Sequence, residues 1–265
     1  SATFQGDIIG FDQCADLSQL SLHPDKCCVL SIGCHDDPNS SDSYVIQNFD
    51  IPFVSTVRDL GALIDTKLQF KDHISVTIRK SSQRIGLIIR AFSTKNMPFL
   101  INMFKSYVRP ILEYNCEVWS PTAITLIDDI ENVQRRFTRR ISAISHLSYS
   151  DRLKVCKLDL LELRRIKRDL VLVFKICNNM VDLSFDDFFE YAPQRGTRGH
   201  SAKLYPRLAR TNQALSVFSS RVVNAWNSLS DDLVRCRSLS AFKRKLSAFD
   251  PVLRQFLKGR ASRDS

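Results

Sequence analysis

The sequence has no apolar run long enough to cross a membrane. A membrane helix needs roughly 18 consecutive apolar residues, whereas the best stretch, residues 170–177, has eight and is interrupted by Lys175. No secretory signal, internal repeat or low-complexity tract is visible, although the chain begins with Ser1 and not with methionine. These absences argue against a membrane-spanning or repeat architecture, and we expect no membrane partner.

The 8 cysteines lack the regular spacing of a disulfide-stapled secreted domain. Several fall on apolar faces, where a reduced cysteine behaves as a small hydrophobic residue. We therefore expect an intracellular, reducing location, in the cytoplasm or the nucleus. A content of 44% hydrophobic and 25% charged residues is typical of a packed globular protein and argues against wholesale disorder.

Charge is distributed unevenly along the chain, whose formal net charge is +10. Residues 1–60 contain two basic and nine acidic residues, whereas the remainder contains 36 basic and 19 acidic residues. A basic segment of this size beside an acidic one is typical of a protein that binds a polyanion. A solvated, merely soluble surface is the alternative explanation.

The first part of the chain combines a helical pattern with short alternating segments. Residues 4–20 show weak helical periodicity, which ends in a turn at Pro24. Strand patterns follow at residues 27–33, 44–49 and 60–64. We expect the edge of a small α+β domain here.

From residue 70 onward, apolar residues recur at helical steps of three and four. The clearest stripe runs from Leu163 to Met180, and basic residues occupy its opposite side. The expected helices cover residues 70–92, 97–114 with a bend near Pro110, 130–144, 163–180, 214–229 and 239–249. The predicted fold class is therefore α+β and mostly helical, with a central all-helical bundle whose outer faces are basic.

A collinear series of phrases resembles one enzyme family. The most specific phrase is YVRPILEYNCEVW at residues 107–119. The others are LHPDKC (22–27), VRDLGALID (57–65), IENVQRRFTRRI (130–141), SYSDRL (148–153), TRGHS (197–201) and VVNAWNSL (222–229). Together they resemble the part that follows the catalytic turn in reverse transcriptases of LINE-type (non-LTR) retrotransposons, with the jockey-like group the nearest match. The resemblance extends from about residue 4 to residue 250.

The resemblance implies a small antiparallel palm remnant followed by an all-α, thumb-like bundle. The implied parts are a palm remnant with primer-grip-like strands (1–68), a helical thumb-like bundle (69–190), a basic loop with C-terminal helices (191–250) and a frayed tail (251–265). A thumb holds the template–primer duplex by its backbone, so the implied partners are an RNA template and an RNA–DNA or DNA duplex. The implied activity of the intact element is RNA-directed DNA synthesis.

The sequence departs from the family at the catalytic carboxylates. Reverse transcriptases hold two Mg²⁺ ions with carboxylates from an early palm aspartate and from a tyrosine-x-Asp-Asp turn between two strands, and neither occurs here. The adjacent aspartates lie in a polar loop or in and near helices, where carboxylates commonly interact with the helix dipole; they are Asp36-Asp37, Asp128-Asp129, Asp186-Asp187 and Asp231-Asp232. We expect no catalytic residue, metal or cofactor in this chain, which is predicted to be inactive alone; Mg²⁺ is implied only for the intact enzyme.

Basic residues are the candidate nucleic-acid contacts, because phosphates are recognised by charge and position. Four arginines within two turns of one predicted helix repel one another unless a polyanion or an acidic partner relieves the repulsion. Lys26 matches a lysine that the family places near the departing pyrophosphate, although a surface lysine at a strand start fits equally well. The candidates are Lys26, Arg79, Lys80, Arg84, Arg135, Arg136, Arg139, Arg140, Arg195, Arg198, His200 and Lys203.

Several of these residues have a simpler interpretation. Arg79, Lys80 and Arg84, taken singly, fit ordinary solvated residues, and Arg198 fits a structural salt bridge. Trp119 and Trp226 could stack on bases, but both follow apolar helical patterns that favour core packing.

Two further interpretations concern metal and function. A zinc site formed by His23, Cys27, Cys34 and His35 fits no common ligand spacing. The alternative functions are a domesticated module that binds RNA or an acidic protein, and the product of a decayed element with no selected role.

Overall fold

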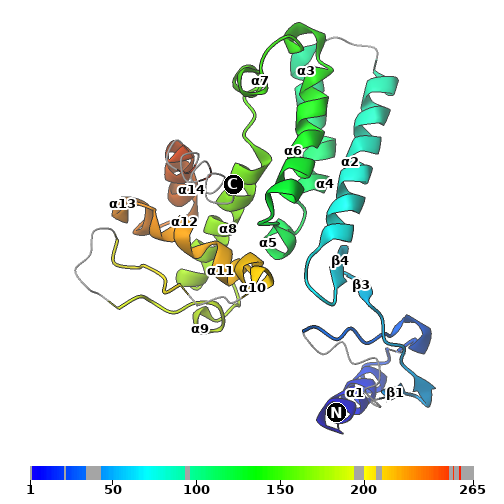
Figure 1. Cartoon of the computed structure of the whole chain (residues 1–265). Helices are drawn as coiled ribbons and strands as arrows, with labels where there is room; N and C mark the ends of the chain where they lie inside the picture. The colour runs from blue at the N-terminus through cyan, green and yellow to red at the C-terminus, as the bar shows by residue number, and fades with distance from the viewer. Residues whose placement is uncertain are drawn as a thin grey trace. The chain divides into compact units, whose positions relative to one another are not determined.

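The structure is a computed structural model that describes residues 2–20, 22–33, 43–92, 96–193, 200–206 and 211–250, with Leu253 and Leu257 (Figure 1). It contains two compact units, Ser1–His73 and Ile74–Ser265. Its described elements are mostly helical, with two antiparallel sheets of two strands each, so the predicted mostly helical α+β class is confirmed. The finer predicted divisions of the chain stay predictions.

The first unit begins with helix α1 (Ala2–Leu17), which confirms the helix predicted there. Strands β1 (Val45–Ile46) and β2 (Phe49–Asp50) form an antiparallel hairpin whose two turn residues, Gln47 and Asn48, have positive φ, as a type I′ turn requires. The side chain of Gln5 joins α1 to this hairpin: it donates to the Val45 carbonyl at 2.8 Å and accepts from the Val45 N–H at 3.0 Å.

A second hairpin leads into the helical part of the chain. Strands β3 (Thr56–Asp59) and β4 (Ala62–Asp65) pair antiparallel, and Leu60 and Gly61 form the turn with φ of 43° and 89°. Leu60 is therefore a turn residue, and the strand predicted over residues 60–64 begins two residues later. The Asp65 carboxylate then accepts three backbone N–H groups, from Lys67, Gln69 and Phe70, at 3.0, 3.1 and 2.7 Å.

The strand predicted over residues 27–33 is wrong in extent. A 3₁₀ turn, η1 (Pro24–Lys26), precedes a segment that forms one isolated parallel bridge, between Val29 and Phe53. The alternating pattern reflects half-buried side chains at residues 27–30, but the pairing does not extend beyond that bridge among the described residues.

The first helical group of the second unit begins with the long helix α2 (Lys71–Ala91). The first three residues of this helix belong to the first unit. Its other elements are α3 (Met97–Met103), the π-helical turn η2 (Phe104–Val108), α4 (Arg109–Glu113), α5 (Cys116–Trp119), α6 (Ile124–Arg139), the 3₁₀ turn η3 (Ser142–Ile144) and α7 (Tyr149–Cys156). Phe104 and Phe137 are fully buried and stack with ring centroids 4.6 Å apart. Burial of each such side chain stabilises the fold by about 1.5–3 kcal/mol.

Residues 97–119 form a helical path with two interruptions. The π-helical turn η2 lies directly before Pro110, whose ring and missing N–H oppose a regular α-helical turn. Asn115 then takes a left-handed conformation (φ 53°, ψ 28°) between α4 and α5. The indole N–H of Trp119 donates to the Tyr114 carbonyl at 2.8 Å, which satisfies an acceptor left open at the helix end.

The second helical group packs around helix α8 (Leu161–Cys177). Its other helices are α9 (Phe185–Phe188), α10 (Asn212–Ser216), α11 (Phe218–Arg221), α12 (Val223–Asn227), α13 (Asp231–Val234) and α14 (Leu239–Ala248). Phe174 of α8 stacks on Phe242 of α14, with centroids 4.3 Å apart. Trp226 is fully buried and its indole N–H donates to the Ala202 carbonyl at 2.9 Å. Trp226 and Trp119 are thus core residues, as predicted.

The single helix predicted over residues 214–229 is wrong, because this segment is divided among three short helices. Val217 is extended (φ −61°, ψ 141°) and separates α10 from α11. The interruption leaves the Ser216 carbonyl open, and this carbonyl accepts an N–H of Arg221 at 2.9 Å. A side chain from the following turn thus replaces the helical hydrogen bond.

None of the described helices is long and apolar enough to cross a bilayer. The longest is α2, whose 21 residues include five that are basic. This finding agrees with the absence of long apolar runs in the sequence.

A buried ion pair joins two helices of the second helical group, and one of its members also contacts the first group. The guanidinium of Arg221 donates twice to the Asp169 carboxylate, at 2.9 Å each, and once to the Glu117 carbonyl at 2.6 Å. The Arg221 and Asp169 side chains are only 5% and 4% exposed. The pair therefore links α11 to α8, and the carbonyl contact extends the link to α5.

We expect Arg221→Met to lower the free energy of unfolding by about 3–5 kcal/mol, because it leaves the Asp169 carboxylate buried without its partner. Urea unfolding followed by circular dichroism measures the loss. Arg235→Met is the matched control, since Arg235 pairs with Asp231 at 2.8 Å on the surface, and its loss should cost less than about 1 kcal/mol. Equal losses of unfolding free energy in the two variants would contradict the stabilising role assigned to the buried Arg221–Asp169 pair.

Candidate nucleic-acid interface

Helix α2 has one buried face and one cationic face. Ile74, Ile85 and Ile88 are buried at helical spacing, which explains why this segment folds as an amphipathic helix. The exposed side carries Arg79, Lys80, Arg84 and Arg90. Within the described part of the chain these four cations form no ion pair. Residues 73–112 contain no aspartate or glutamate, so no neighbour within this segment can pair with them.

Helix α6 changes charge along its length. Its first half contains the three acidic residues of the helix, and the charged residues of its last two turns are all basic. Arg136, Arg139 and Arg140 are exposed and form no ion pair with any described residue. Arg135 differs, since its guanidinium lies 5.0 Å from the centre of the Tyr149 ring and 4.0 Å from a carboxylate oxygen of Asp128. Three of the four predicted arginines are therefore available at the surface.

A buried polar network fixes the end of α6. The carboxylate of Glu131 accepts the Tyr149 hydroxyl and the Leu161 N–H, the latter at 2.8 Å. Arg152 donates to the Thr138 hydroxyl at 3.1 Å and to the Leu147 carbonyl at 2.8 Å. Burial raises the pKa of the Glu131 carboxyl, while the hydrogen bonds from Tyr149 and Leu161 act in the opposite direction.

This network is not apparent from the sequence, although the sequence carries one signal that bears on it. Ser148 and Asp151 stand at the spacing of a capping box before α7, and the Ser148 hydroxyl accepts the Asp151 N–H at 3.2 Å. That signal locates the start of α7, which carries Tyr149 and Arg152. It does not by itself predict the contacts that these two side chains make with α6.

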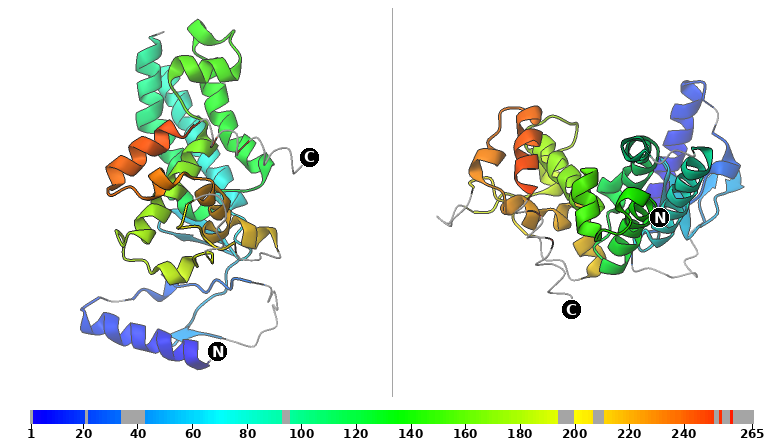
Figure 2. Two further views of the ribbon diagram at one scale, coloured as in Figure 1. Left: turned by 90° about the vertical axis from the view of Figure 1, so that its left-hand side faces the viewer. Right: turned by 90° about the horizontal axis from the view of Figure 1, so that it is seen from above.

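Some of the exposed cations lie at one end of the first helical group. Figure 1 and the left view of Figure 2 show that α2 and α6 end near the beginning of α3. Arg90 lies in the last turn of α2, and Arg136 and Arg139 lie in the last turn of α6. Cations in a last helical turn interact favourably with the partial negative charge of the helix end. That interaction is worth a few tenths of a kcal/mol to about 1 kcal/mol and leaves the charges free to bind phosphates.

The prediction of a basic outer face on the helix over residues 163–180 is wrong. Three cations of α8 form ion pairs with acidic residues from other segments, and a fourth, Arg165, is buried. The pairs are Arg164–Glu113, Arg168–Glu117 at 2.8 Å, and Lys167 with Asp159 at 3.1 Å and with Asp250 at 2.7 Å. Hydrogen bonding to Glu113 raises the pKa of Arg164. These charges hold helices together and are unavailable to a polyanion.

Arg165 is 1% exposed, and its three guanidinium nitrogens have no hydrogen-bond partner among the described residues. Burial lowers the pKa of this guanidinium, while the surrounding carboxylates of Glu131, Glu162 and Asp169 act in the opposite direction. These carboxylates thus offset part of the cost of burying the positive charge. Arg165 cannot contact a surface ligand.

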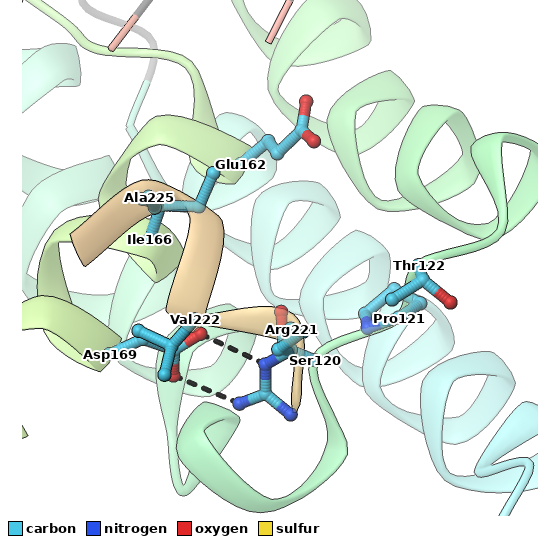
Figure 3. Close-up of a pocket in the computed structure, with 9 residues that line it drawn as sticks. All are labelled: Ser120, Pro121, Thr122, Glu162, Ile166, Asp169, Arg221, Val222 and Ala225. Carbon is cyan, nitrogen blue, oxygen red and sulfur yellow. Dashed lines mark hydrogen bonds and ion pairs between the residues drawn. The ribbon is translucent and has the colours of Figure 1, made fainter. Parts of the chain in front are cut away.

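A small cavity lies between α8 and the short helices α11 and α12 (Figure 3). Its volume is about 20 Å³, which is room for about one water molecule. Figure 3 shows Asp169 and Arg221 on its wall, bound to each other by two hydrogen bonds. Because these charged groups satisfy one another, we assign no ligand to this cavity.

His200 is a correction to the predicted contacts. It is 3% exposed, its Nε2 lies 3.1 Å from the Trp226 carbonyl, and its ring meets the Trp226 ring edge-on. Its side chain therefore belongs to the core and cannot contact a bound strand. Lys203 is half-buried, and its carbonyl accepts the Ala192 N–H at 2.8 Å. Arg195 and Arg198 lie outside the described residues.

Lys26 is exposed at the end of η1, which both interpretations of it allow. Of the aspartate pairs, Asp36-Asp37 lies outside the described residues and Asp128-Asp129 lies within α6. Asp186-Asp187 and Asp231-Asp232 occupy the first turns of α9 and α13, as predicted for dipole partners.

The four residues whose spacing fits no common zinc site lie partly outside the described residues. Cys34 and His35 lie outside the described residues, and His23 is exposed, with Nδ1 3.7 Å from a carboxylate oxygen of Asp25. Over the described ranges, no group of three or more His, Cys, Asp or Glu side chains could hold a metal ion.

Comparison with known proteins gives one partial relative. The chain is 32% identical over 100 residues to the uncharacterized protein B0403.1 of Caenorhabditis elegans, a match that covers 37% of this chain and 50% of that protein. The chain thus spans about half the length of this relative. No family model matches the sequence, and no solved structure matches it either. The function is therefore inferred from the geometry and charge of the site.

The buried position of His200 predicts a pH dependence of stability. Burial lowers its pKa below the usual value of about 6.5, so the folded protein favours the neutral ring. The resulting stability is complete above about pH 6.5 and is lost as the pH falls and the unfolded state takes up the proton. We expect the unfolding free energy to fall between pH 7.5 and pH 5.5, and to fall less in His200→Gln. Urea unfolding across this range measures both slopes, and equal slopes would contradict the burial of His200.

Proposed function

We propose that this chain is the nucleic-acid-binding, thumb-like part of a LINE-type retrotransposon RNA-directed DNA polymerase. It binds the template–primer duplex by its phosphates, through the exposed cations of α2 and the last two turns of α6. Its partners are an RNA template and an RNA–DNA or DNA duplex. In the whole protein, Mg²⁺ and aspartates from another segment carry the polymerisation, and the chain by itself binds without catalysing.

The observation that carries this proposal is the contrast between two sets of cations. Four cations of α8 are paired with or buried among carboxylates, namely Arg164, Arg165, Lys167 and Arg168. Those of α2, with Arg136, Arg139 and Arg140 of α6, are exposed and without acidic partners among the described residues. Like charges held close together repel, so an arrangement of this kind favours a polyanionic ligand. Phosphates held by arginine and lysine position a duplex without reading its sequence.

The resemblance supports the finer assignment of the two units. The first unit carries the hairpin β3–β4, whose VRDLGALID segment resembles the strand after the catalytic turn in the family. The second unit begins with helical segments that include the phrases YVRPILEYNCEVW and IENVQRRFTRRI. We therefore assign the end of a palm and a primer-gripping hairpin to the first unit, and a thumb to the second.

The triple variant Arg136→Gln, Arg139→Gln, Arg140→Gln tests the proposal. We expect its affinity for a fluorescent RNA–DNA hybrid to fall about tenfold or more at 100 mM salt. Each lost phosphate contact also removes about 0.9 from the slope of log K against log salt, so the slope should become shallower by about 2–3. Fluorescence anisotropy at several salt concentrations measures both quantities.

The matched control is Arg237→Gln, Lys243→Gln, Arg244→Gln, which removes three exposed cations near and within α14. It changes the net charge equally and should change the affinity less than about threefold. Equal losses would mean that total charge governs binding, and the assignment to α6 would be wrong. Stronger binding to polyglutamate than to the hybrid would favour the acidic-protein alternative.

A further inference from the structure

Two hydroxyl residues at the end of α6 share a sequence pattern, and the fold exposes only one of them. A pair of arginines stands three and two residues before Thr138, and a second pair stands three and two residues before Ser142. Protein kinases select substrates partly by their charge pattern, and those with an acidic substrate groove prefer arginines at these two positions. The two residues are equivalent in this pattern, so only the structure distinguishes them.

Thr138 is inaccessible in the folded chain. It is 0% exposed, and its hydroxyl donates to the Gln134 carbonyl at 3.0 Å. The same hydroxyl accepts an N–H of Arg152 at 3.1 Å. An enzyme could reach this oxygen only by unfolding the end of α6, so the first pattern is not a modification site in the folded chain.

Ser142 lies on the surface shortly after α6 and begins η3. Its hydroxyl has no hydrogen-bond partner within the described part of the chain. The preceding residue, Ile141, is extended (φ −81°, ψ 104°), so the chain has left the helix before the serine. Ile141 is 2% exposed, but it occupies the position that this pattern leaves open. The three residues that the pattern specifies, Arg139, Arg140 and Ser142, are all exposed.

The surroundings of Ser142 favour a phosphate group. Residues 132–150 contain no aspartate or glutamate, and Arg136, Arg139 and Arg140 form no ion pair with any described residue. The end of α6 contributes only about half a negative charge. A phosphoserine carries about −1.5 to −2 charges at pH 7 and accepts charge-assisted hydrogen bonds from arginine. Such a group at this position cancels up to about two of the three arginine charges.

We infer that Ser142 is a phosphorylation site for an arginine-directed protein serine kinase, and that its phosphorylation releases the chain from nucleic acid. This inference rests on the proposed function and adds its regulation. In the reaction, the Ser142 Oγ attacks the γ-phosphorus of ATP, the bond to the β–γ bridging oxygen breaks, ADP leaves, and the hydroxyl proton passes to the base of the kinase. The phosphate on Ser142 then binds the guanidinium groups of Arg139 and Arg140 in place of the phosphates of a duplex.

The site is tested by treating the full 265-residue chain with ATP and purified cyclic-AMP-dependent protein kinase. Mass spectrometry of the chain and its fragments should find phosphate on Ser142 and none on Thr138. Ser142→Ala should lose this phosphate, whereas Ser145→Ala, which alters a neighbouring exposed serine, should keep it. Modification of Thr138 as fast as Ser142, or no modification of Ser142, would overturn the inference.

Release is tested by fluorescence anisotropy with the RNA–DNA hybrid before and after kinase treatment. Phosphorylation should lower the affinity about tenfold at 100 mM salt and make the slope of log K against log salt shallower by about 2, since each lost phosphate contact removes about 0.9. Before treatment, Ser142→Ala should bind within about twofold of the unaltered chain, and treatment should not change its affinity. A saturating concentration of hybrid should slow the phosphorylation of Ser142, because the hybrid covers the arginines that the kinase must bind.

The inference and the proposed function fail in different ways. If Ser142 carries phosphate and the hybrid affinity is unchanged, while the α6 arginine variant still binds more weakly, the regulation is wrong and the proposed function stands. If treated Ser142→Ala loses as much affinity as the treated unaltered chain, phosphate elsewhere is responsible and the assignment to Ser142 is wrong. If the unaltered chain binds no hybrid, the proposed function and the release are both wrong.

Discussion

The neutralisation of helix α8 by acidic residues from other segments is the constraint on which the second unit depends. Glu113 and Glu117 pair with Arg164 and Arg168, and Asp169 pairs with Arg221. Burying a charge without a partner costs several kcal/mol, so these pairs fix which helices approach α8 and in which orientation. They also determine which lysines and arginines remain without an acidic partner among the described residues. The uncompensated cations lie where acidic residues are missing from the sequence, on α2 and at the end of α6.

Two kinds of arginine therefore coexist in one helical unit. Those of α8 hold the packing together, and their removal is expected to act on stability. Those at the end of α6 have little to contribute to folding beyond their interaction with the helix end, and their removal is expected to act on binding. The network of Glu131, Tyr149 and Arg152 also acts on stability. It fixes the backbone at the end of α6 that carries the exposed arginines.

The exposed cations of α2 and of the end of α6 lie in two segments without carboxylates, residues 73–112 and 132–150. A segment of that composition cannot neutralise itself. Its apolar side packs inward, as Phe104 and Phe137 show, and its polar side keeps its charge. The proposed duplex site uses this remaining positive charge.

The sequence by itself determined the longer helices and the distribution of charge in this protein, because helical periodicity and the placement of lysine, arginine and acidic residues are local properties. It predicted the helices over residues 70–92, 97–114 and 239–249 and the burial of both tryptophans. Only the tertiary structure decided which cations are free. Arg164 and Arg136 look alike in sequence, but Arg164 meets Glu113, which lies 51 residues away along the chain. His200 likewise lies in a polar, basic segment and is buried against Trp226. Periodicity along one helix cannot indicate which distant carboxylate or ring the fold will bring beside it.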